Sequence, residues 1–573
     1  MTDGTRNCQN CKSQFTIAPE GFNFYKKASV PPPTFCPQCR RQRRMTWRNE
    51  RTLYRRSCDL CEKSMLSVYA PERHKLVYCT QCWYSDKWSP LDFGAEYDFS
   101  KPFFVQFKEL LKRAPLPNLS LTNITESDYC NYSLDLKNCY LLFGSWSCED
   151  SMYCERVVRC TNACDSMWLT QGDFMYDATY CTQSQNLMSA FDAHTSRDSA
   201  LLAHCREVSR CFGCINLRNQ SYFIFNEPHT KESYAEKVKL WDTGSYATYQ
   251  DAKKKFEELS RRSIHPATIN KQTANSSGDM LRSCKNCTQC FLSSEGEDSA
   301  YCVLMEKNFK DCRDIWIAME NTELCYEIIA AGANNQGSKF GVTLYQGCSR
   351  LEYCYTCVGA HDSFGCVGLK QNNYCILNKE YSKEEYNKLI GKIREQMSIL
   401  PYKDKRNIEC LYGEFFPAET SPFAYNESLA QEWFPLTKEG ALTQGYGWKE
   451  PETRSYKITK QPADLPDNIK DAPDSITQEV VACAHREKGN EQCTSAFRII
   501  PAELQRRKCL CEGANSAGRI AYRNTAAHFH DDAPCPNEFE TTFAPDPRYA
   551  EGSGEARRRE IVYCEQCYNA ETA

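Results

Sequence analysis

Two blocks of cysteines near the start of the chain have the spacing of tetrahedral metal sites. Each block contains two Cys-x2-Cys pairs, separated by 24 residues in the first block and by 17 in the second. A Cys-x2-Cys turn presents two thiolates to one side of an ion, and two such turns complete a four-coordinate zinc site. The predicted ligands are Cys8, Cys11, Cys36 and Cys39 in the first block, and Cys58, Cys61, Cys79 and Cys82 in the second.

The ligand set also indicates what these sites do. The expected metal is Zn2+, and mononuclear iron is the alternative because four thiolates bind either ion. Four protein ligands leave no open position at which a water molecule is activated. We therefore expect small zinc-ribbon modules of the treble-clef type, in which the ion is structural.

The C-terminal end of the chain repeats the second cysteine block. The segment 561–568, IVYCEQCY, matches 76–83, LVYCTQCW, and the sequence that follows Cys535 matches the sequence that follows Cys61. This duplication predicts another metal site whose fourth ligand is open, with His528 and His530 as alternatives to cysteine. The predicted ligands are Cys535, Cys564 and Cys567 together with Cys509 or Cys511.

A remnant of the first cysteine block precedes that site. Cys483 and Cys493 keep one knuckle of a ribbon that is otherwise truncated, because the counterparts of the Pro-rich loop and of the second cysteine pair are missing. These two cysteines either bind a further ion or bind nothing. In total we expect two to four Zn2+ ions per chain.

A stretch of arginines lies directly after the first block. Residues 39–56, CRRQRRMTWRNERTLYRR, contain eight arginines and one acid. As a helix, this segment would present a stripe of guanidinium groups with interleaved aromatic rings, which is typical of contact with a phosphate backbone and stacking on bases. The alternative is a solvated face, or arginines that pair with acids of the repeats. The residues predicted to bind nucleic acid are Arg40, Arg44, Trp47, Arg48, Arg51 and Arg55.

The middle of the chain is duplicated. The segment 212–234 aligns with 364–386 at an offset of 152 residues, whereas 148–157 aligns with 296–305 at an offset of 148, so the second copy has gained four residues. Short strand-like pieces separated by Asn, Asp, Ser and Gly recur at intervals of 10–15 residues in each copy. This pattern favours a β-solenoid, and a β-sandwich is the alternative. A helix is predicted after Thr230 and another after Ser382, and the second would cap an open solenoid end.

The repeats contain further cysteine pairs, at 211 and 214, at 284, 287 and 290, and at 354 and 357. They resemble ligand pairs. A solenoid interior, however, favours small apolar side chains that stack from one coil to the next, and buried cysteine behaves as such a side chain. We interpret these cysteines as packing residues, with metal binding as the alternative.

The fold class predicted from these patterns is mainly β, with two Cys- and aromatic-rich β-solenoid-like repeats flanked by small zinc modules and short capping helices. The predicted domains are zinc ribbon 1 with an Arg-rich helix (1–56), zinc ribbon 2 (57–100), repeat A with its end helix (128–243), a helical linker (244–283), repeat B with its end helix (284–400), an extended connector (401–475) and a C-terminal zinc-ribbon module (476–573).

Composition narrows the class of protein. The chain has 573 residues, a formal net charge of −4 and 37 cysteines, and it is too long for a single core. It has no apolar run of membrane-spanning length and no secretory signal pattern, so we expect a cytoplasmic protein with reduced thiols. It also has no P-loop, dinucleotide fingerprint, GxSxG or HExxH motif, and we therefore expect no enzymatic activity.

Three segments carry a resemblance to known sequences: 15–61, which spans the Pro-rich loop and the arginines, 212–228 and 412–428. Over nearly its whole length the chain resembles an uncharacterised family of Cys-rich, multi-zinc-ribbon, treble-clef-like repeat proteins from small-genome uncultured bacteria. The resemblance implies no particular activity, and the chain departs from the family at the truncated ribbon of Cys483 and Cys493.

The leading functional hypothesis is a zinc-binding, non-enzymatic scaffold that binds RNA or DNA through its basic N-terminal module. The alternative is a protein–protein interaction scaffold whose zinc sites are purely structural. Neither a membrane nor a small-molecule substrate is expected as a partner.

Overall fold

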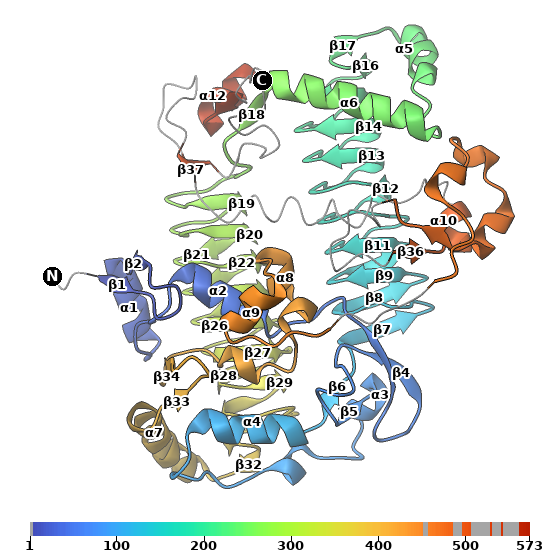
Figure 1. Ribbon diagram of the computed structural model, residues 1–573. Coiled ribbons are helices and arrows are strands. Elements are labelled where there is room, and N and C mark those ends of the chain that lie inside the picture. The colour runs from blue at the N-terminus through green and yellow to red at the C-terminus, as the bar shows by residue number, and fades with distance from the viewer. Residues whose placement is uncertain are drawn as a thin grey trace.

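The computed structural model describes residues 4–450, 456–484, 495–505, 528–529, 540–541 and 561–572. The protein is mainly β, with 32% of residues in strands and 24% in helices, which confirms the predicted class. Most strands belong to two tall stacks of parallel strands (Figure 1). Across the described ranges, no helix is both long enough and apolar enough to cross a bilayer.

The first stack, called stack A here, extends from Leu121 to Ile224. Its strands are β7 (Leu121–Thr125), β8 (Ser133–Lys137), β9 (Tyr140–Phe143), β10 (Trp146–Glu149), β11 (Met152–Glu155), β12 (Asp173–Tyr176), β13 (Gln185–Phe191), β14 (Arg197–Ala203), β15 (Phe212–Ile215) and β16 (Phe223–Ile224).

All rungs of stack A have the same length in residues. Its strands pair in parallel at a constant offset of twelve residues, as in the pairs Gln185–Arg197 and Ala200–Phe212. Every third residue from Asn123 to Tyr222 has a positive φ, although only two of these residues are glycine. Because the backbone turns back after each triplet, one residue in three points inward. Four triplets make one rung of the stack.

The inward positions explain why the repeats are rich in cysteine and serine. The hydroxyl of Ser133 donates to the carbonyl of Asn131 (3.0 Å) and accepts the N–H of Ser145, one rung later (3.2 Å). The thiol of Cys148 lies 3.4 Å from the carbonyl of Trp146 and 3.3 Å from that of Val157. Small side chains thus fill the interior and satisfy the corner carbonyls. The repeat cysteines are buried in these interiors, as the packing interpretation predicts.

The second stack, stack B, extends from Gly278 to Ile376. Its strands are β19 (Gly278–Arg282), β20 (Cys290–Ser294), β21 (Gly296–Glu297), β22 (Val303–Met305), β23 (Phe309–Lys310), β24 (Arg313–Ala318), β25 (Thr322–Glu323), β26 (Tyr326–Ala331), β27 (Lys339–Leu344), β28 (Ser349–Glu352), β29 (Tyr355–Cys357), β30 (His361–Phe364) and β31 (Cys375–Ile376).

Four consecutive rungs of stack B are longer than those of stack A. Register runs from Glu297 to Lys310, Glu323, Gln336 and Ser349, and each of these steps is thirteen residues. The next step, from Ser349 to His361, returns to twelve. These four single-residue additions account for the four residues by which the sequence offset grows between the two copies.

The stacks run in opposite directions and meet along one side (Figure 1). Contact between them includes the guanidinium of Arg156 from stack A over the ring of Trp316 from stack B. Stack A ends in the hairpin formed by β16 and β17 (Glu227–Pro228) and helix α5 (Lys231–Lys237), and stack B ends in β32 (Lys379–Glu380) and helix α7 (Lys383–Ile399). Thr230 and Ser382 are the N-caps of these helices, as predicted.

Each stack is entered through the same local structure. Helix α4 (Phe103–Arg113) leads to β6 (Leu116–Pro117) at the start of stack A, and helix α6 (Tyr246–Arg262) leads to β18 (Ile264–Pro266) at the start of stack B. A short strand from a cysteine-rich module pairs with each entry strand in parallel. The duplicated unit therefore includes the helix and strand before the stack as well as the stack itself.

The connector after α7 lies across stack B (Figure 1). Its short elements are β33 (Tyr402–Lys403), β34 (Glu409–Cys410), α8 (Leu429–Trp433) and α9 (Lys438–Thr443). Buried aromatic rings of the connector, of α4 and of stack B form the largest hydrophobic core, in which Tyr353 stacks on Phe340 and packs against Phe416.

Candidate metal centres

The first cysteine block forms one compact group. Cys8 and Cys11 lie on the knuckle between β1 (Thr5–Asn7) and β2 (Gln14–Thr16), which precedes helix α1 (Pro19–Lys27). Cys36 is the N-cap of helix α2 (Pro37–Met45), and Cys39 lies in its first turn. The four Sγ atoms lie within 4.8 Å of one another, and those of Cys11 and Cys36 are 3.8 Å apart.

The second block has the same construction. Cys58 and Cys61 lie on the knuckle between β3 (Tyr54–Ser57) and β4 (Ser64–Ser67). Cys79 follows β5 (Val77–Tyr78) and is the N-cap of helix α3 (Thr80–Trp83), which contains Cys82. These Sγ atoms also lie within 4.8 Å of one another, with 3.9 Å between Cys61 and Cys79.

The sulfur spacing fits a tetrahedral ion. Bonds of about 2.3 Å from an ion to four sulfurs place the sulfurs about 3.8 Å apart, close to the separations in both groups. Backbone N–H groups point at the thiolates as well: that of Cys36 at Cys8 Sγ (3.3 Å) and that of Cys79 at Cys58 Sγ (3.2 Å). Both predicted four-cysteine groups are therefore assembled, and each could hold a metal ion.

One thiol of each group has a lowered pKa. The pKa values of Cys36, Cys39, Cys79 and Cys82 are raised, that of Cys39 by hydrogen bonds with Cys36 and Cys8 and those of Cys79 and Cys82 by burial. Burial opposes ionisation of Cys58, but the backbone N–H donors, led by that of Cys79, outweigh it and lower the pKa to about 7. The hydrogen bond with the Cys36 side chain is the main cause that lowers the pKa of Cys8. Since metals bind the thiolate, one cysteine in each group is ready to bind at neutral pH.

Both knuckles bend without glycine. Lys12 and Glu62 follow the second cysteine of each knuckle and have φ of 66° and 61°. Their N–H groups donate to the carbonyls of Cys8 (3.0 Å) and Cys58 (2.8 Å). The two blocks therefore have one backbone conformation, as a duplicated module requires.

Half of each C-terminal counterpart is visible. Strand β39 (Ile561–Tyr563) pairs with β18, and Cys564 is the N-cap of helix α12 (Glu565–Glu571), which contains Cys567; β5, Cys79 and α3 have this same arrangement. In the remnant, the N–H of Cys483 donates to Ser495 (2.9 Å) across the hairpin of β35 (Val481–Ala482) and β36 (Ala496–Phe497), just as Cys8 donates to Ser13. The remaining predicted ligands, Cys493, Cys509, Cys511 and Cys535, and the alternative His530, lie outside the described residues, and the side chain of His528 is not described.

Further short elements of the C-terminal module are α10 (Pro501–Gln505), β37 (His528–Phe529) and β38 (Glu540–Thr541). The α10 helix follows the remnant hairpin as α1 follows the first hairpin, so the order of the elements is duplicated too.

The arginines of α2 are buried against stack B. Arg40 pairs with Asp314 of β24 (2.8 Å), and Arg44 pairs with Glu327 of β26 (3.3 Å). Both guanidinium groups are no more than 2% exposed, and both carboxylates are fully buried. Arg43 also pairs with Glu327 and reaches Glu414 of the connector (2.8 Å). A carboxylate network, rather than solvent, faces the arginine stripe.

The structure therefore corrects the predicted nucleic-acid contact. Helix α2 ends at Met45, so no single helical stripe reaches Arg55. Trp47 is 1% exposed and packs against Phe416, and Arg48 lies over the Tyr132 ring (3.6 Å) and pairs with Glu50. The prediction is wrong for Arg40, Arg44, Trp47 and Arg48 as solvent-facing residues.

The other two residues of that prediction are more accessible. Arg51 is 34% exposed and pairs with Glu155 and Glu432, and Arg55 is exposed on β3. In the described residues, arginines of the segment 39–56 pair with acids of the repeats, as the alternative interpretation predicts. The individual acidic partners of Arg40, Arg43 and Arg44 could not be predicted, because they lie 270 to 371 residues away in the chain and nothing local marks them.

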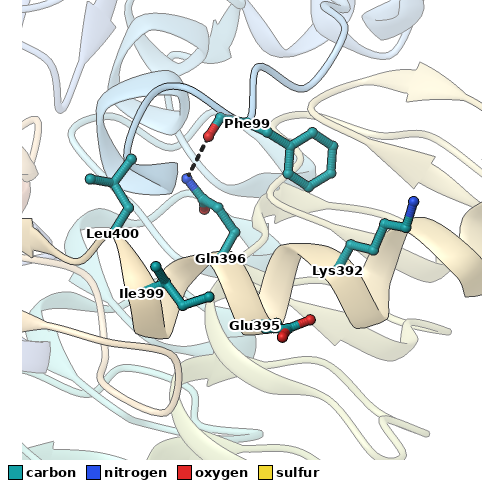
Figure 2. Close-up of a pocket in the computed structure, with 6 residues that line it drawn as sticks. All are labelled: Phe99, Lys392, Glu395, Gln396, Ile399 and Leu400. Atoms are coloured by element: carbon teal, nitrogen blue, oxygen red, sulfur yellow. Dashed lines mark hydrogen bonds between the residues drawn. The ribbon is translucent and has the colours of Figure 1, made fainter.

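The hollow in Figure 2 has no catalytic arrangement. It is lined by Phe99 and by α7 residues such as Lys392, Glu395 and Gln396, and the Gln396 amide donates to the carbonyl of Phe99 (3.4 Å). Its lining has no histidine, cysteine or serine that would form a nucleophile–base pair.

Comparison with known proteins adds no family to this description. No protein-family model matches the chain, and no curated protein is significantly similar to it.

Proposed function

We propose that this protein is a zinc-dependent, non-enzymatic scaffold in which two β-solenoids, stacks A and B, are framed by zinc modules. The observation that carries the proposal is the docking of α2. This helix begins at a metal-site cysteine, and its arginines neutralise carboxylates buried in stack B. The zinc module is thus packed against stack B and stabilises it, and does not act as a mobile recognition arm.

Zinc is the proposed metal because both sites offer four thiolates at tetrahedral spacing and no further position. In this role Cys8, Cys11, Cys36 and Cys39 hold the knuckle to the start of α2, and the second group holds its knuckle to α3. The ion supplies a cross-link between segments that are distant in sequence.

A protein partner fits this arrangement better than RNA or DNA bound through residues 39–56. Most arginines of that segment already have carboxylate partners inside the protein, so a phosphate backbone would have to displace buried ion pairs. Binding of RNA or DNA is a second candidate, favoured by the cations between the stacks that are described below.

Metal analysis of the full chain tests the first part of the proposal. We expect at least two zinc ions per chain, and three if the C-terminal site is complete; fewer than two would contradict it. Cross-linking in the native cell, followed by identification of the captured molecules, tests the second part. A protein partner supports the scaffold, and capture of nucleic acid alone contradicts the choice of a protein partner.

A further inference from the structure

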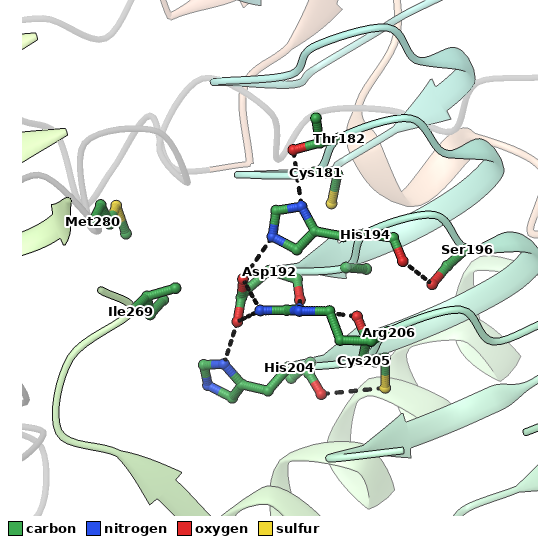
Figure 3. Close-up of polar contacts among 12 residues, drawn as sticks. Cys181, Thr182, Asp192, His194, Ser196, His204, Cys205, Arg206, Ile269 and Met280 are labelled. Atoms are coloured by element: carbon green, nitrogen blue, oxygen red, sulfur yellow. Dashed lines mark hydrogen bonds and ion pairs between the residues drawn. The ribbon is translucent and has the colours of Figure 1, made fainter. Parts of the chain in front are cut away.

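A row of polar side chains on stack A serves none of the purposes described above. Thr182, His194, Arg206 and Arg218 occupy successive rungs, and each is in register with the next. Figure 3 shows His194 and Arg206 beside Asp192 and His204, on the side of stack A that faces Ile269 and Met280 at the entry to stack B. The row therefore lies where the two stacks face each other.

Asp192 at the centre of this row is fully engaged. Its side chain is 2% exposed and accepts hydrogen bonds from His194 Nε2 (2.9 Å), His204 Nδ1 (2.8 Å) and Arg206 Nη2 (2.8 and 3.0 Å). Burial raises its pKa, but the hydrogen bonds from the two histidines outweigh burial and hold the pKa well below its usual range. Asp192 thus carries one negative charge, which neutralises Arg206.

Three more cations surround this pair. Lys271 and Arg282 are exposed neighbours in register at the entry to stack B. Arg218 Nη2 donates to Asn569 Oδ1 (3.1 Å) and Thr572 Oγ1 (3.2 Å), both of them neutral groups at the C-terminal end of α12. Arg206 and Arg218 are in register on stack A, and Lys271 and Arg282 are in register at the entry to stack B, which faces Asp192 in Figure 3. Desolvation and the charge of Arg206 lower the pKa of Lys271, and Asp192 opposes this shift.

The carboxylates nearby do not balance this charge. Besides Asp192 there is Asp279, whose Oδ1 accepts the N–H groups of Ile269 (2.6 Å) and Met280 (2.7 Å). Among the residues that the structure describes here, four cations against these two carboxylates leave two positive charges. Residues in register on adjacent parallel strands lie about 4.8 Å apart, and like charges at that distance destabilise the pair. Both the Arg206–Arg218 pair and the Lys271–Arg282 pair are of this kind.

We propose that these residues form a binding site for a phosphate group, between stacks A and B, with Arg206, Arg218, Lys271 and Arg282 as its cations. A phosphate dianion, or two phosphodiester groups of a nucleic-acid backbone, matches the excess of two charges, and guanidinium groups bind phosphate oxygens in pairs. The site goes beyond the scaffold role, which needs no ligand here. The phosphate is either free or part of a larger molecule such as a nucleic-acid backbone, because the chemistry of recognition is the same.

The test uses the full-length, zinc-loaded protein and inorganic phosphate, titrated by calorimetry at low ionic strength. We expect saturable binding that weakens at least tenfold in the double variant K271Q/R282Q. The matched control is K285Q, which removes an exposed charge three residues after Arg282, on the next face of the same rung, and leaves affinity unchanged. Both changes are on exposed side chains, and thermal unfolding and zinc content confirm that each variant folds.

A second titration with single-stranded RNA distinguishes the two sources of phosphate. RNA that binds wild type and K285Q alike, and K271Q/R282Q at least tenfold more weakly, identifies the phosphate as part of a nucleic acid. Phosphate binding without RNA binding identifies free phosphate or a small phosphorylated molecule. The proposal is overturned if neither phosphate nor RNA binds saturably, or if K285Q loses as much affinity as K271Q/R282Q.

Discussion

Stack A and stack B are copies of one repeat, but they are stabilised in different ways. Stack A has uniform twelve-residue rungs, and its interior of Cys, Ser, Ala and Leu is closed by local hydrogen bonds. Stack B has four longer rungs and carries two fully buried carboxylates, Asp314 and Glu327, on a face covered by α2 and the connector. The buried charges of stack A are few and include Arg156, which pairs with Glu50 of the N-terminal segment. Stack B instead has a cluster of buried carboxylates that is neutralised by the arginines of α2.

The largest difference between the stabilities of the two stacks is expected when a zinc ligand is removed. Cys36→Ser removes a ligand at the start of α2, so we expect loss of one zinc ion per chain and exposure of the stack B carboxylates. Binding of a structural zinc contributes on the order of 10 kcal/mol to folding, and we expect stack B to open while stack A stays folded. Hydrogen exchange read separately over 121–224 and 278–376 measures this. Equal loss of protection in both stacks would contradict the comparison.

Removal of a buried acid is the next largest effect. Glu327→Ala leaves Arg43 and Arg44 partly unpaired in the protein interior, which costs about 3–5 kcal/mol. The matched control in stack A is Glu149→Ala, since Glu149 pairs with Lys137 on the exposed surface. Such a pair contributes about 0–1 kcal/mol. Denaturant unfolding measures the loss in free energy of unfolding for each variant. Similar losses in both would show that the stability of stack B does not depend on its buried ion pairs.

The ion pairs of Glu50, which link the N-terminal segment to stack A, should respond to acid. Burial raises the pKa of Glu50, but Arg156 of stack A and Arg48 outweigh it and lower the pKa to about 2. A lowered carboxylate pKa contributes stability that is present above the unfolded value of about 4.5 and is lost as the pH falls toward 2. Glu50→Gln should therefore reduce stability at pH 7 and flatten the decline between pH 4.5 and 2. If urea unfolding showed the same decline in stability between pH 4.5 and 2 in Glu50→Gln as in wild type, these ion pairs would not be its cause.

The smallest effect is expected inside stack A. Cys148→Ser places a hydroxyl where Ser133, Ser145 and Ser151 already occupy equivalent inward positions. We expect a change within about 1 kcal/mol, as for a substitution that keeps volume and finds a partner, and no loss of zinc. Cys36→Ser and Cys148→Ser are the same chemical change, so the different results would distinguish a metal ligand from a packing residue. Loss of zinc from Cys148→Ser would show that the repeat cysteines bind metal.

The sequence allowed prediction of what depends on neighbours along the chain. The N-terminal four-cysteine groups follow from spacing, and the helix after Ser382 follows from its capping box with Glu385. The rung was missed although its signal is present: inward positions recur every third residue, as at Cys130, Ser133, Leu136, Cys139 and Leu142. Serine and glycine at such positions hide the period from a search for apolar residues alone.

The arginine stripe shows the opposite limit. Composition marks residues 39–56 as basic, but whether a guanidinium meets water or a carboxylate depends on Asp314, Glu327 and Glu414, which only folding brings to α2. A long-range ion pair leaves no local pattern. The basic charge of the segment is predictable from sequence, whereas the choice between nucleic acid and the acids of the repeats, which stood as the alternative, is not.

The left-handed backbone at every third residue restricts how this protein can evolve. For side chains other than Gly, Asn and Asp, that conformation costs roughly 1–2 kcal/mol per residue, and β-branched residues suit it least. Between Asn123 and Tyr222 the only β-branched residue at these positions is Thr195. In a complete mutational scan, the tolerance to substitution should therefore repeat every three residues. The inward position is limited by side-chain volume, the left-handed position by its backbone angle, and the third tolerates most residues. New binding specificities would arise by substitution at that third position.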